Sequence, residues 1–342
     1  MKLPAYALLQ MSDQDRAERE ARSIGSTLWL MSHEGDGSSG KIKLMRADRP
    51  SFLYRGQNTH YNPCWPSICR GFRDNTYLVR DLDAVDRARL LRGLALNIWF
   101  AVEVSKHPMM KWAVAERIDI DYAAIAQHYG VPTGYMDLSE SFEVSAFFAT
   151  CRYVPTRREW EPMQDGEGVM YRLPVEAIEE RAAPICYQPF PRPARQWAWT
   201  VELRLGEDFL QAPMLQSFRF DHDPQVGEEI LKRFGGGPEL LPPDPTARLA
   251  AAICATPEIP IACIEEAEAQ LADDPSGVSS EEAKNVRNLL RDKLKYSFSN
   301  SSAVGYTSDE LTRTENEWHT LRGDFYRGVG VQLVRTRRED DV

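Results

Sequence analysis

The fold is decided by one stretch in the middle of the chain, Gln127-His128-Tyr129-Gly130-Val131-Pro132-Thr133-Gly134-Tyr135-Met136-Asp137-Leu138-Ser139. Apolar residues at helical spacing over 119–129 predict a helix, and Gly130 is a typical residue to end it. The proline that follows predicts a turn, and Ser139 or Ser141 is a suitable N-cap for a second helix. The stretch therefore gathers polar side chains between two apolar runs.

Outward from this stretch, the pattern of apolar residues predicts both helices and strands. A stripe at three- and four-residue spacing predicts a long helix over 83–107, which Pro108 is expected to close. Alternation of apolar and polar residues predicts strands over 168–173 and 197–205. A shorter strand is predicted over 51–54, stopped by Gly56. Further helices are predicted over 12–23, 225–234, 246–254, 261–272 and 280–296.

Some local features follow from single residues. Ser12 is a suitable N-cap for the first helix. The segment 184–193 contains four prolines and predicts an extended loop. Ser279 and Glu282 have the spacing of a capping box at the start of the last helix, and a final strand is predicted at 330–334.

These elements together predict an α+β fold, in which helices surround a small, mainly antiparallel sheet. We expect an N-terminal helical extension over residues 1–44 and an α+β domain over 45–205. A mainly helical C-terminal region is expected over 206–342.

Composition narrows the class of protein. The chain has 342 residues, an apolar fraction of 43% and a charged fraction of 27%, which is typical of a soluble globular protein. A formal net charge of −10 argues against a general nucleic-acid-coating protein. No apolar run is long enough for a transmembrane helix, and the N-terminal patch lacks the layout of a signal peptide. The six scattered cysteines are expected to be reduced thiols, so a cytoplasmic location is predicted.

Several kinds of site lack their sequence signature. The six histidines have no ligand spacing among them, so no metal is expected. The chain has no phosphate-binding loop of the G-x-x-x-x-G-K-[ST] type and no G-x-S-x-G nucleophile elbow.

Arg55 is the first candidate for chemistry, since it lies where a short apolar strand stops. An arginine there can bind a phosphate or carboxylate in a bidentate manner, and the neighbouring Gly56 permits close backbone approach. The alternative is a structural ion pair between Arg55 and Asp137, and both readings stay open at this point.

The polar turn and a later strand supply the other candidates. His128 lies at a helix C-terminus, where it is either catalytic or a hydrogen-bonded histidine that fixes the turn. Ser139 is either functional or only a helix cap. Gln196, in Arg195-Gln196-Trp197-Ala198-Trp199, can both donate and accept hydrogen bonds, but it is equally well explained as a polar edge-strand residue.

Three of these stretches resemble the FRG domain family. Phe52-Leu53-Tyr54-Arg55-Gly56-Gln57, followed by Trp65-Pro66-Ser67-Ile68-Cys69-Arg70, is similar to its N-terminal signature. The run from Ala126 to Thr133, A-Q-H-Y-G-V-P-T, resembles its middle motif, and Ala146-Phe147-Phe148-Ala149 resembles the end of the helix after it. Arg195-Gln196 is similar to the family's late R-Q motif, so the resemblance spans roughly residues 45–205.

The chain departs from the family pattern at the turn. Gly134-Tyr135-Met136 stands where the family has R-L-L, so a second cation is missing at this place. Asp137-Leu138-Ser139 replaces D-W-T, and Ser139 retains the hydroxyl group.

The order of the motifs also resembles that of the Arg-Ser-Glu type ADP-ribosyltransferases. The resemblance implies that Arg55 anchors NAD, that Ser139 braces the nicotinamide ribose, and that Gln196 or Glu202 occupies the position of the acid. Glu202 is a substitute because an alternating strand would place it on the same face as Gln196. The implied ligand-binding residues are Tyr54, Arg55, Gly56, Gln57 and His128.

The sequence thus predicts an NAD-consuming enzyme that modifies a macromolecular acceptor, protein or nucleic acid. In a bacterial setting the expected role is that of a toxin or anti-phage effector. The competing prediction is a non-catalytic FRG binding module whose Arg55, Asp137 and His128 network is structural.

Overall fold

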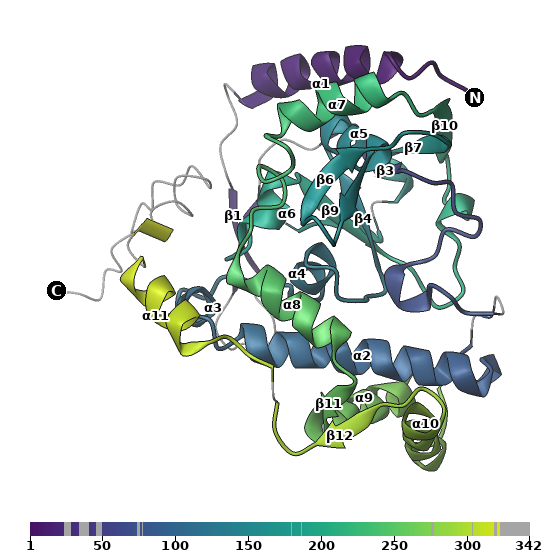
Figure 1. Cartoon of the computed structure of the whole chain (residues 1–342), viewed down its shortest axis with the longest axis vertical. Coiled ribbons are helices and arrows are strands. Elements are labelled where there is room, and N and C mark those ends of the chain that lie inside the picture. Colours follow the sequence, from purple (N-terminus) through teal and green to yellow (C-terminus); the bar gives the residue numbers. More distant parts are fainter. Residues whose placement is uncertain are drawn as a thin grey trace.

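The computed structural model describes residues 1–23, 29–33, 41–45, 50–73, 76, 78–178, 180–185, 187–274, 277–302, 304–317 and 320–321. Within these ranges the centre of the molecule is a six-stranded antiparallel sheet with the order β10-β7-β3-β4-β9-β8 (Figure 1). The strands are β3 (Phe52–Gln57), β4 (Tyr135–Ser139), β7 (Glu167–Pro174), β8 (Ala182–Pro184), β9 (Ala198–Glu202) and β10 (Gln216–Asp221). The predicted α+β class is confirmed.

The two middle strands, β3 and β4, are joined at one point only. Their ladder consists of the single pair Tyr54↔Ser139, whereas β3 pairs with β7 along its whole length. Strand β4 likewise pairs with β9 along its whole length, from Tyr135↔Glu202 to Ser139↔Ala198. The sheet is therefore made of two well-paired halves with an opening between them.

Helices cover one face of this sheet. Helix α5 (Phe142–Thr150) packs on β3 and β7, and α1 (Ala7–Ser23) and α7 (Pro224–Arg233) lie over α5 (Figure 1). Their shared core contains side chains from all three helices and the sheet, including Leu8, Phe147, Met170 and Ile230. Burial of this apolar surface stabilises the layer at roughly 25 cal/mol per Å².

An ion cluster crosses the same layer. The carboxylate of Glu143, which is only 3% exposed, accepts hydrogen bonds from Arg16 and Arg19 of α1 and from Arg233 of α7. A buried carboxylate needs such partners because it is costly to remove a charge from water. The N-terminal helix is thus tied to the sheet layer by charge as well as by apolar contact.

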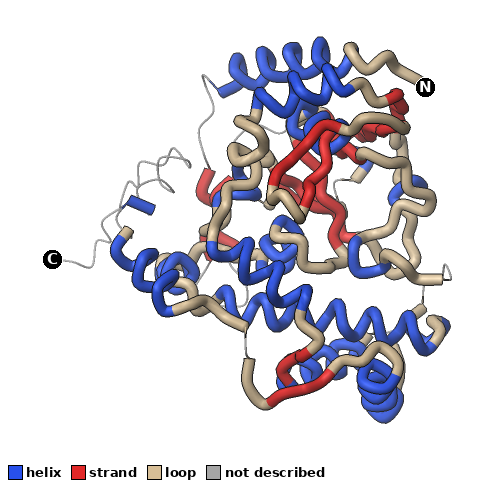
Figure 2. Tube along the Cα trace, viewed as in Figure 1, coloured by secondary structure: helices blue, strands red, loops and turns tan. Residues whose placement is uncertain are grey.

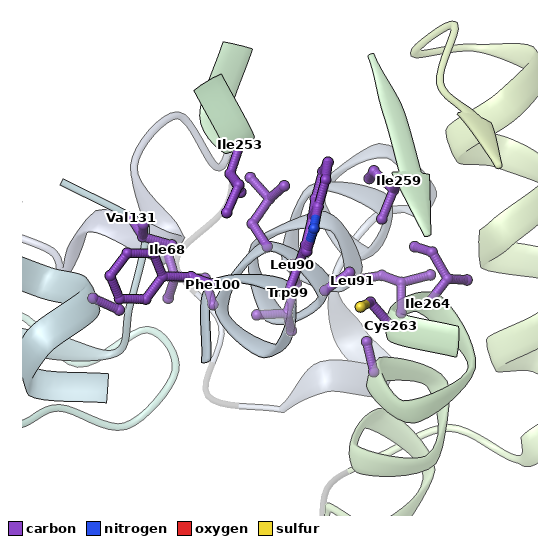
Figure 3. Packing of buried hydrophobic residues seen from close by; sticks show 14 of the residues in the cluster. Ile68, Leu90, Leu91, Trp99, Phe100, Val131, Ile253, Ile259, Cys263 and Ile264 are labelled. Atoms are coloured by element: carbon purple, nitrogen blue, oxygen red, sulfur yellow. The ribbon is translucent and has the colours of Figure 1, made fainter. Parts of the chain in front are cut away.

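A second group of helices forms the other side of the molecule. The long helix α2 (Ala84–Val104) packs against α8 (Pro245–Ala255), α9 (Ile261–Asp273) and α10 (Ser280–Asp292). Figure 3 shows Leu90, Trp99 and Phe100 of α2 among other buried side chains of the same core. These include Ile253 of α8, Ile264 of α9, and Ile68 and Val131 from segments outside these helices. Figure 2 shows the strands of the main sheet between this group and the helices of the first layer.

Shorter elements complete the described part. They are β1 (Trp29–His33), β2 (Lys41–Met45), η1 (Ser67–Cys69), η2 (Val79–Asp81), α3 (Pro108–Ala115), α4 (Tyr122–His128), β5 (Cys151–Val154), β6 (Glu159–Pro162), η3 (Val175–Ala177), α6 (Pro191–Arg195), η4 (Phe209–Gln211), β11 (Glu258–Pro260), β12 (Ser297–Ser299) and α11 (Ser308–Asn316). Among the described helices, none combines the length and apolar character needed to cross a membrane.

Most predicted helices are confirmed, and so are two of the predicted caps. Gly130 follows α4 with a φ of +81°, and Ser279 and Glu282 form a capping box at α10. Of the two serines proposed as caps before α5, it is Ser141 that accepts from the Val144 amide.

Other local predictions were wrong. Ser12 does not cap α1, which begins at Ala7 and buries Ser12 inside the helix. Pro108 opens α3 rather than ending the preceding helix, since proline is well suited to a first helical turn. The strand at 51–54 continues through Gly56, and the prolines at 191 and 193 lie in α6 instead of an extended loop.

Two further expectations concern the chain after residue 205. The strand predicted at 330–334 lies outside the described residues. The region expected to be mainly helical, 206–342, also contributes β10 to the main sheet and packs its helices against α2.

Candidate functional site

A cavity of about 560 Å³ lies beside the opening between β3 and β4. Its wall is formed by residues of both strands, the C-terminus of α4, helix α5, the β5–β6 hairpin and the segment around α6. Of the residues predicted for the site, Tyr54, Arg55, Gly56, Gln57, His128, Ser139 and Gln196 all contribute to the lining. The size is within the usual range for small-molecule sites.

Arg55 spans the opening between the two strands. Its Nη1 donates a hydrogen bond of 2.7 Å to the main-chain carbonyl of Asp137, in place of a ladder bond between β3 and β4. The guanidinium Nε is buried and has no hydrogen-bond partner. Arg55 is therefore held by the main-chain carbonyl of Asp137 and not by an ion pair with the Asp137 carboxylate. Part of the hydrogen-bonding capacity of its guanidinium is left for another group.

Gly56 allows a close backbone approach, as predicted, and the group that approaches β3 at this position is helix α5. A Cβ atom at this position would lie 1.7 Å from the carbonyl oxygen of Ser145. Gln57 is buried, and its Nε2 lies 3.4 Å from the Cys64 sulfur. Both residues therefore have structural roles at the cavity wall.

His128 is held in one orientation by Gln196. The His128 Nδ1 lies 2.9 Å from Gln196 Oε1, while Gln196 Nε2 donates to the carbonyl of Leu240 at 3.2 Å. Because the carboxamide oxygen accepts, Nδ1 carries the hydrogen in this arrangement. The other ring nitrogen, Nε2, is buried without a hydrogen bond and lies 3.8 Å from Asp137 Oδ1.

Asp137 is positioned by a polar network under the turn. Its Oδ2 accepts a 3.0 Å hydrogen bond from Gln127 Nε2. The oxygen of the same Gln127 carboxamide accepts from the hydroxyl groups of Ser67 and Thr133, so it cannot rotate freely. Asp137 is the one carboxylate among the described residues that line the cavity.

Ser139 is buried and its hydroxyl group is occupied. The Oγ donates to the carbonyl of Gln196 at 2.7 Å and accepts from the amide of Ser141 at 3.0 Å. This geometry ties β4 to the segment before β9 and prepares the cap of α5. The structure thus brings Ser139 to the site, but as a brace between two elements.

Glu202 is not brought to the cavity. It lies at the exposed end of β9, opposite Tyr135, and its carbonyl accepts from Arg181. The face argument that linked it to Gln196 was wrong, because Gln196 caps α6 and Trp197 has a φ of +51°. Strand alternation begins only at Ala198.

Some lining residues were not predicted. Arg70 follows η1 and faces the cavity, and it belongs to the W-P-S-I-C-R stretch that the sequence did mark. Arg70 is exposed as a whole residue, but its guanidinium is surrounded by protein atoms. This burial, and to a smaller extent the charge of Arg55, lowers the pKa of Arg70. Arg70 thus supplies at a different place the second cation that the turn lacks.

Arg192 of α6 supplies a third cation to the cavity lining. Its guanidinium lies 4.3 Å from the centre of the Tyr129 ring, and its Nε lies 3.9 Å from Asp244 Oδ2. The Tyr129 hydroxyl donates to the same carboxylate at 2.8 Å. Burial raises the pKa of both Tyr129 and Asp244, and this cluster closes the cavity against the start of α8.

The remaining wall is aromatic. The ring of Trp160 lies 6.1 Å from that of Phe148 and 5.6 Å from that of Tyr153, centre to centre. Tyr153 is 46% exposed, and Tyr61, which also lines the cavity, is 49% exposed. Phe148 lies in the Ala146–Ala149 motif, but no motif marked Tyr153 and Trp160, because the β5–β6 hairpin that carries them was not predicted.

The described residues contain no group of three or more side chains arranged to hold a metal ion. The described residues that line the cavity offer guanidinium groups, one carboxylate, a histidine and aromatic rings.

Comparison with known families supports the resemblance seen in the motifs. A family model described as the FRG domain matches residues 50–157. No curated protein and no solved structure matches the chain. The match contains Arg55, Arg70, His128, Asp137 and Ser139, and it ends before Gln196.

Proposed function

We propose that this chain, which contains an FRG domain over residues 50–157, binds NAD in the cavity beside β3 and β4 and transfers its ADP-ribosyl group. The observation that carries the proposal is that Arg55, Ser139 and Gln196, which are far apart in sequence, line one cavity. This is the arrangement that the order of the motifs implies for an ADP-ribosyltransferase.

Arg55 would bind a phosphate of the dinucleotide, since its side chain lines the cavity without a carboxylate partner and a guanidinium suits a phosphate. Asp137 is the proposed cation-stabilising group. As the bond between ribose C1′ and nicotinamide nitrogen breaks, its electron pair leaves with nicotinamide, and a nearby carboxylate stabilises the positive ribosyl carbon. An acceptor nucleophile then bonds to C1′ and loses a proton.

Ser139 and Gln196 take different roles in this proposal from those implied by the resemblance. Their polar groups are hydrogen-bonded to the protein, so they orient His128 and hold β4 in place. A macromolecular acceptor and a role as a toxin or anti-phage effector stay predictions from the sequence.

A second function, that of a non-catalytic binding module, is favoured by the same hydrogen bonds. Both the hydroxyl of Ser139 and the carboxamide of Gln196 are already engaged by protein groups. A cavity of this kind can bind a ligand without changing it.

The two functions are separated by measuring binding and nicotinamide release on the same protein. We expect the full chain to bind NAD and release nicotinamide, and Arg55→Ala to lower the rate by about 100-fold, the usual effect of removing one key charge-stabilising group. Asp137→Asn, which can still accept from Gln127, should retain NAD binding and lose release.

The matched control is Arg157→Ala, which removes an exposed arginine that does not line the cavity. Its rate should equal that of the unmodified chain. NAD binding without release, with or without acceptor proteins and nucleic acids, would leave the binding module as the function. A folded chain that neither binds nor cleaves NAD contradicts the transferase.

A further inference from the structure

The cavity contains two guanidinium groups that do not have a carboxylate partner within the described residues. The Arg55 side chain donates only to a main-chain carbonyl, and the Arg70 side chain makes no hydrogen bond or ion pair with the described residues. Both side chains line the same cavity, and burial, followed by the charge of Arg55, lowers the pKa of Arg70. Two cations placed together in this way favour an anion between them.

Two other arginines of limited exposure are paired with carboxylates. Arg19 contacts Asp15 and Glu143, and Arg287 contacts Glu268. Asp137 lies near the two cavity arginines, but its Oδ2 accepts from Gln127 and its Oδ1 faces His128. The charges of Arg55 and Arg70 are therefore only partly balanced by the protein.

The aromatic wall lies across the same cavity. Phe148, Tyr153 and Trp160 form a continuous set of rings, and Tyr153 remains 46% exposed. Exposed rings at a cavity can stack on a planar heterocycle, as aromatic side chains do on the bases of single-stranded nucleic acids. A cavity of about 560 Å³ has room for a ring and a phosphate group together.

We propose that Arg55 and Arg70 form a two-guanidinium clamp for a diphosphate, while the wall of Phe148, Tyr153 and Trp160 holds the heterocyclic ring of the same ligand. The ligand class is a nucleoside diphosphate or a molecule that contains one. This inference rests on the proposed function, since NAD contains such a group, and it assigns to Arg70 a role that the motif order does not give it.

The test is to measure, by isothermal titration calorimetry, the affinity of the full chain for ADP, AMP, adenosine and inorganic pyrophosphate. We expect ADP to bind most tightly and Arg70→Ala to weaken it by about tenfold, the usual order for one charge-assisted contact. Adenosine affinity should be unchanged by Arg70→Ala. Arg157→Ala, on the hairpin that carries the aromatic wall, should change ADP affinity by less than about twofold because its charge is exposed and screened.

Thermal unfolding of each variant shows whether it is folded, and Arg70→Gln replaces the alanine variant if that one is not. Equal ADP affinity in the folded Arg70 variant and the unmodified chain overturns the clamp, as does ADP binding no tighter than adenosine.

The same proteins distinguish this inference from the proposed function. ADP affinity that depends on Arg70, together with no nicotinamide release from NAD, supports the clamp and contradicts the transferase. Nicotinamide release with NAD affinity unaffected by Arg70→Ala contradicts the clamp and leaves the transferase in place.

Discussion

His107 is a buried histidine at the start of α3, and its ring has a defined protonation state. The Nδ1 accepts from the Met109 amide at 3.2 Å, so this nitrogen has no hydrogen, and the ring packs 5.1 Å from both Phe190 and Tyr306. Burial lowers the pKa of His107 from 6.5 to about 4. The folded protein therefore holds the neutral ring at a pH where an exposed histidine is charged.

This predicts an acid-sensitive contribution to stability. Between pH 6.5 and about 4 the unfolded chain binds a proton at His107 that the folded chain does not, so stability falls as the pH is lowered through this window. We expect a loss of about 3 kcal/mol at pH 4 relative to pH 7, on the basis of 1.36 kcal/mol per pKa unit. Denaturant unfolding of the unmodified chain and of His107→Asn across this pH range measures it.

Asparagine is a suitable replacement because it can still cap α3. The difference in unfolding free energy between the two proteins should change between pH 7 and pH 4 and be constant above pH 7. Parallel pH profiles for the two proteins would mean that His107 is not the group responsible.

Only some residues of the site could be predicted from the sequence. His128 and Asp137 lie in one contiguous stretch, so their proximity followed from local turns, whereas Arg55 was linked to them by a recognisable motif pattern. Arg70 and the ring of Trp160 enter the cavity from segments whose position depends on distant packing. The engagement of Ser139 and Gln196 by main-chain groups is also tertiary, and no spacing in the sequence encodes it.

At the scale of elements, the packing of β3 on α5 limits what can replace Gly56. A methyl group there would lie 1.7 Å from the Ser145 oxygen and 2.9 Å from the Ala149 nitrogen, both of which are helix backbone atoms. We expect Gly56→Ala to destabilise the protein by about 3 kcal/mol, because the strand and the helix must move apart. Denaturant unfolding measures the change.

Gly134→Ala is the matched control, since the nearest atom to its added methyl group is 3.8 Å away. That variant should unfold within about 0.5 kcal/mol of the unmodified chain, as most unstrained substitutions do. Similar unfolding free energies for the two glycine variants would show that the close contact at Gly56 relaxes without cost.

Elements with long, regular patterns were predicted, whereas several short strands were missed. The apolar stripe of α2 and the capping box of α10 can be read from neighbouring residues alone. Strand β4 was read as a turn, since its five residues include Asp137 and carry buried side chains on both faces. Strand β10 alternates weakly, and only its pairing with β7 defines it.

At the scale of the whole molecule, the segment that matches the family is only part of a folding unit. Residues 50–157 contain β3 and β4 but neither β7 nor β9, the strands with which these two form their long ladders. The segment also contains α2, whose buried face packs on α8, α9 and α10. Excising it would expose both surfaces to water.

We therefore expect a chain of residues 50–157 to lack cooperative unfolding, whereas the full chain unfolds in a sharp transition. Circular dichroism during thermal unfolding and the dispersion of amide proton resonances measure the difference. The fragment should retain some helical signal because α2 is long, but without fixed tertiary packing. A fragment with well-dispersed resonances and a cooperative transition would show that the matched segment folds by itself.

The single-pair junction between β3 and β4 has a consequence for biosynthesis. On the ribosome both strands are made before β7 and β9, so the nascent chain contains two strands that can scarcely pair with each other. Each waits for a partner translated later, and the edges left open in the meantime can pair with the wrong chain. Strand order thus leaves an edge of β4 without its long ladder until residue 202 has left the exit tunnel.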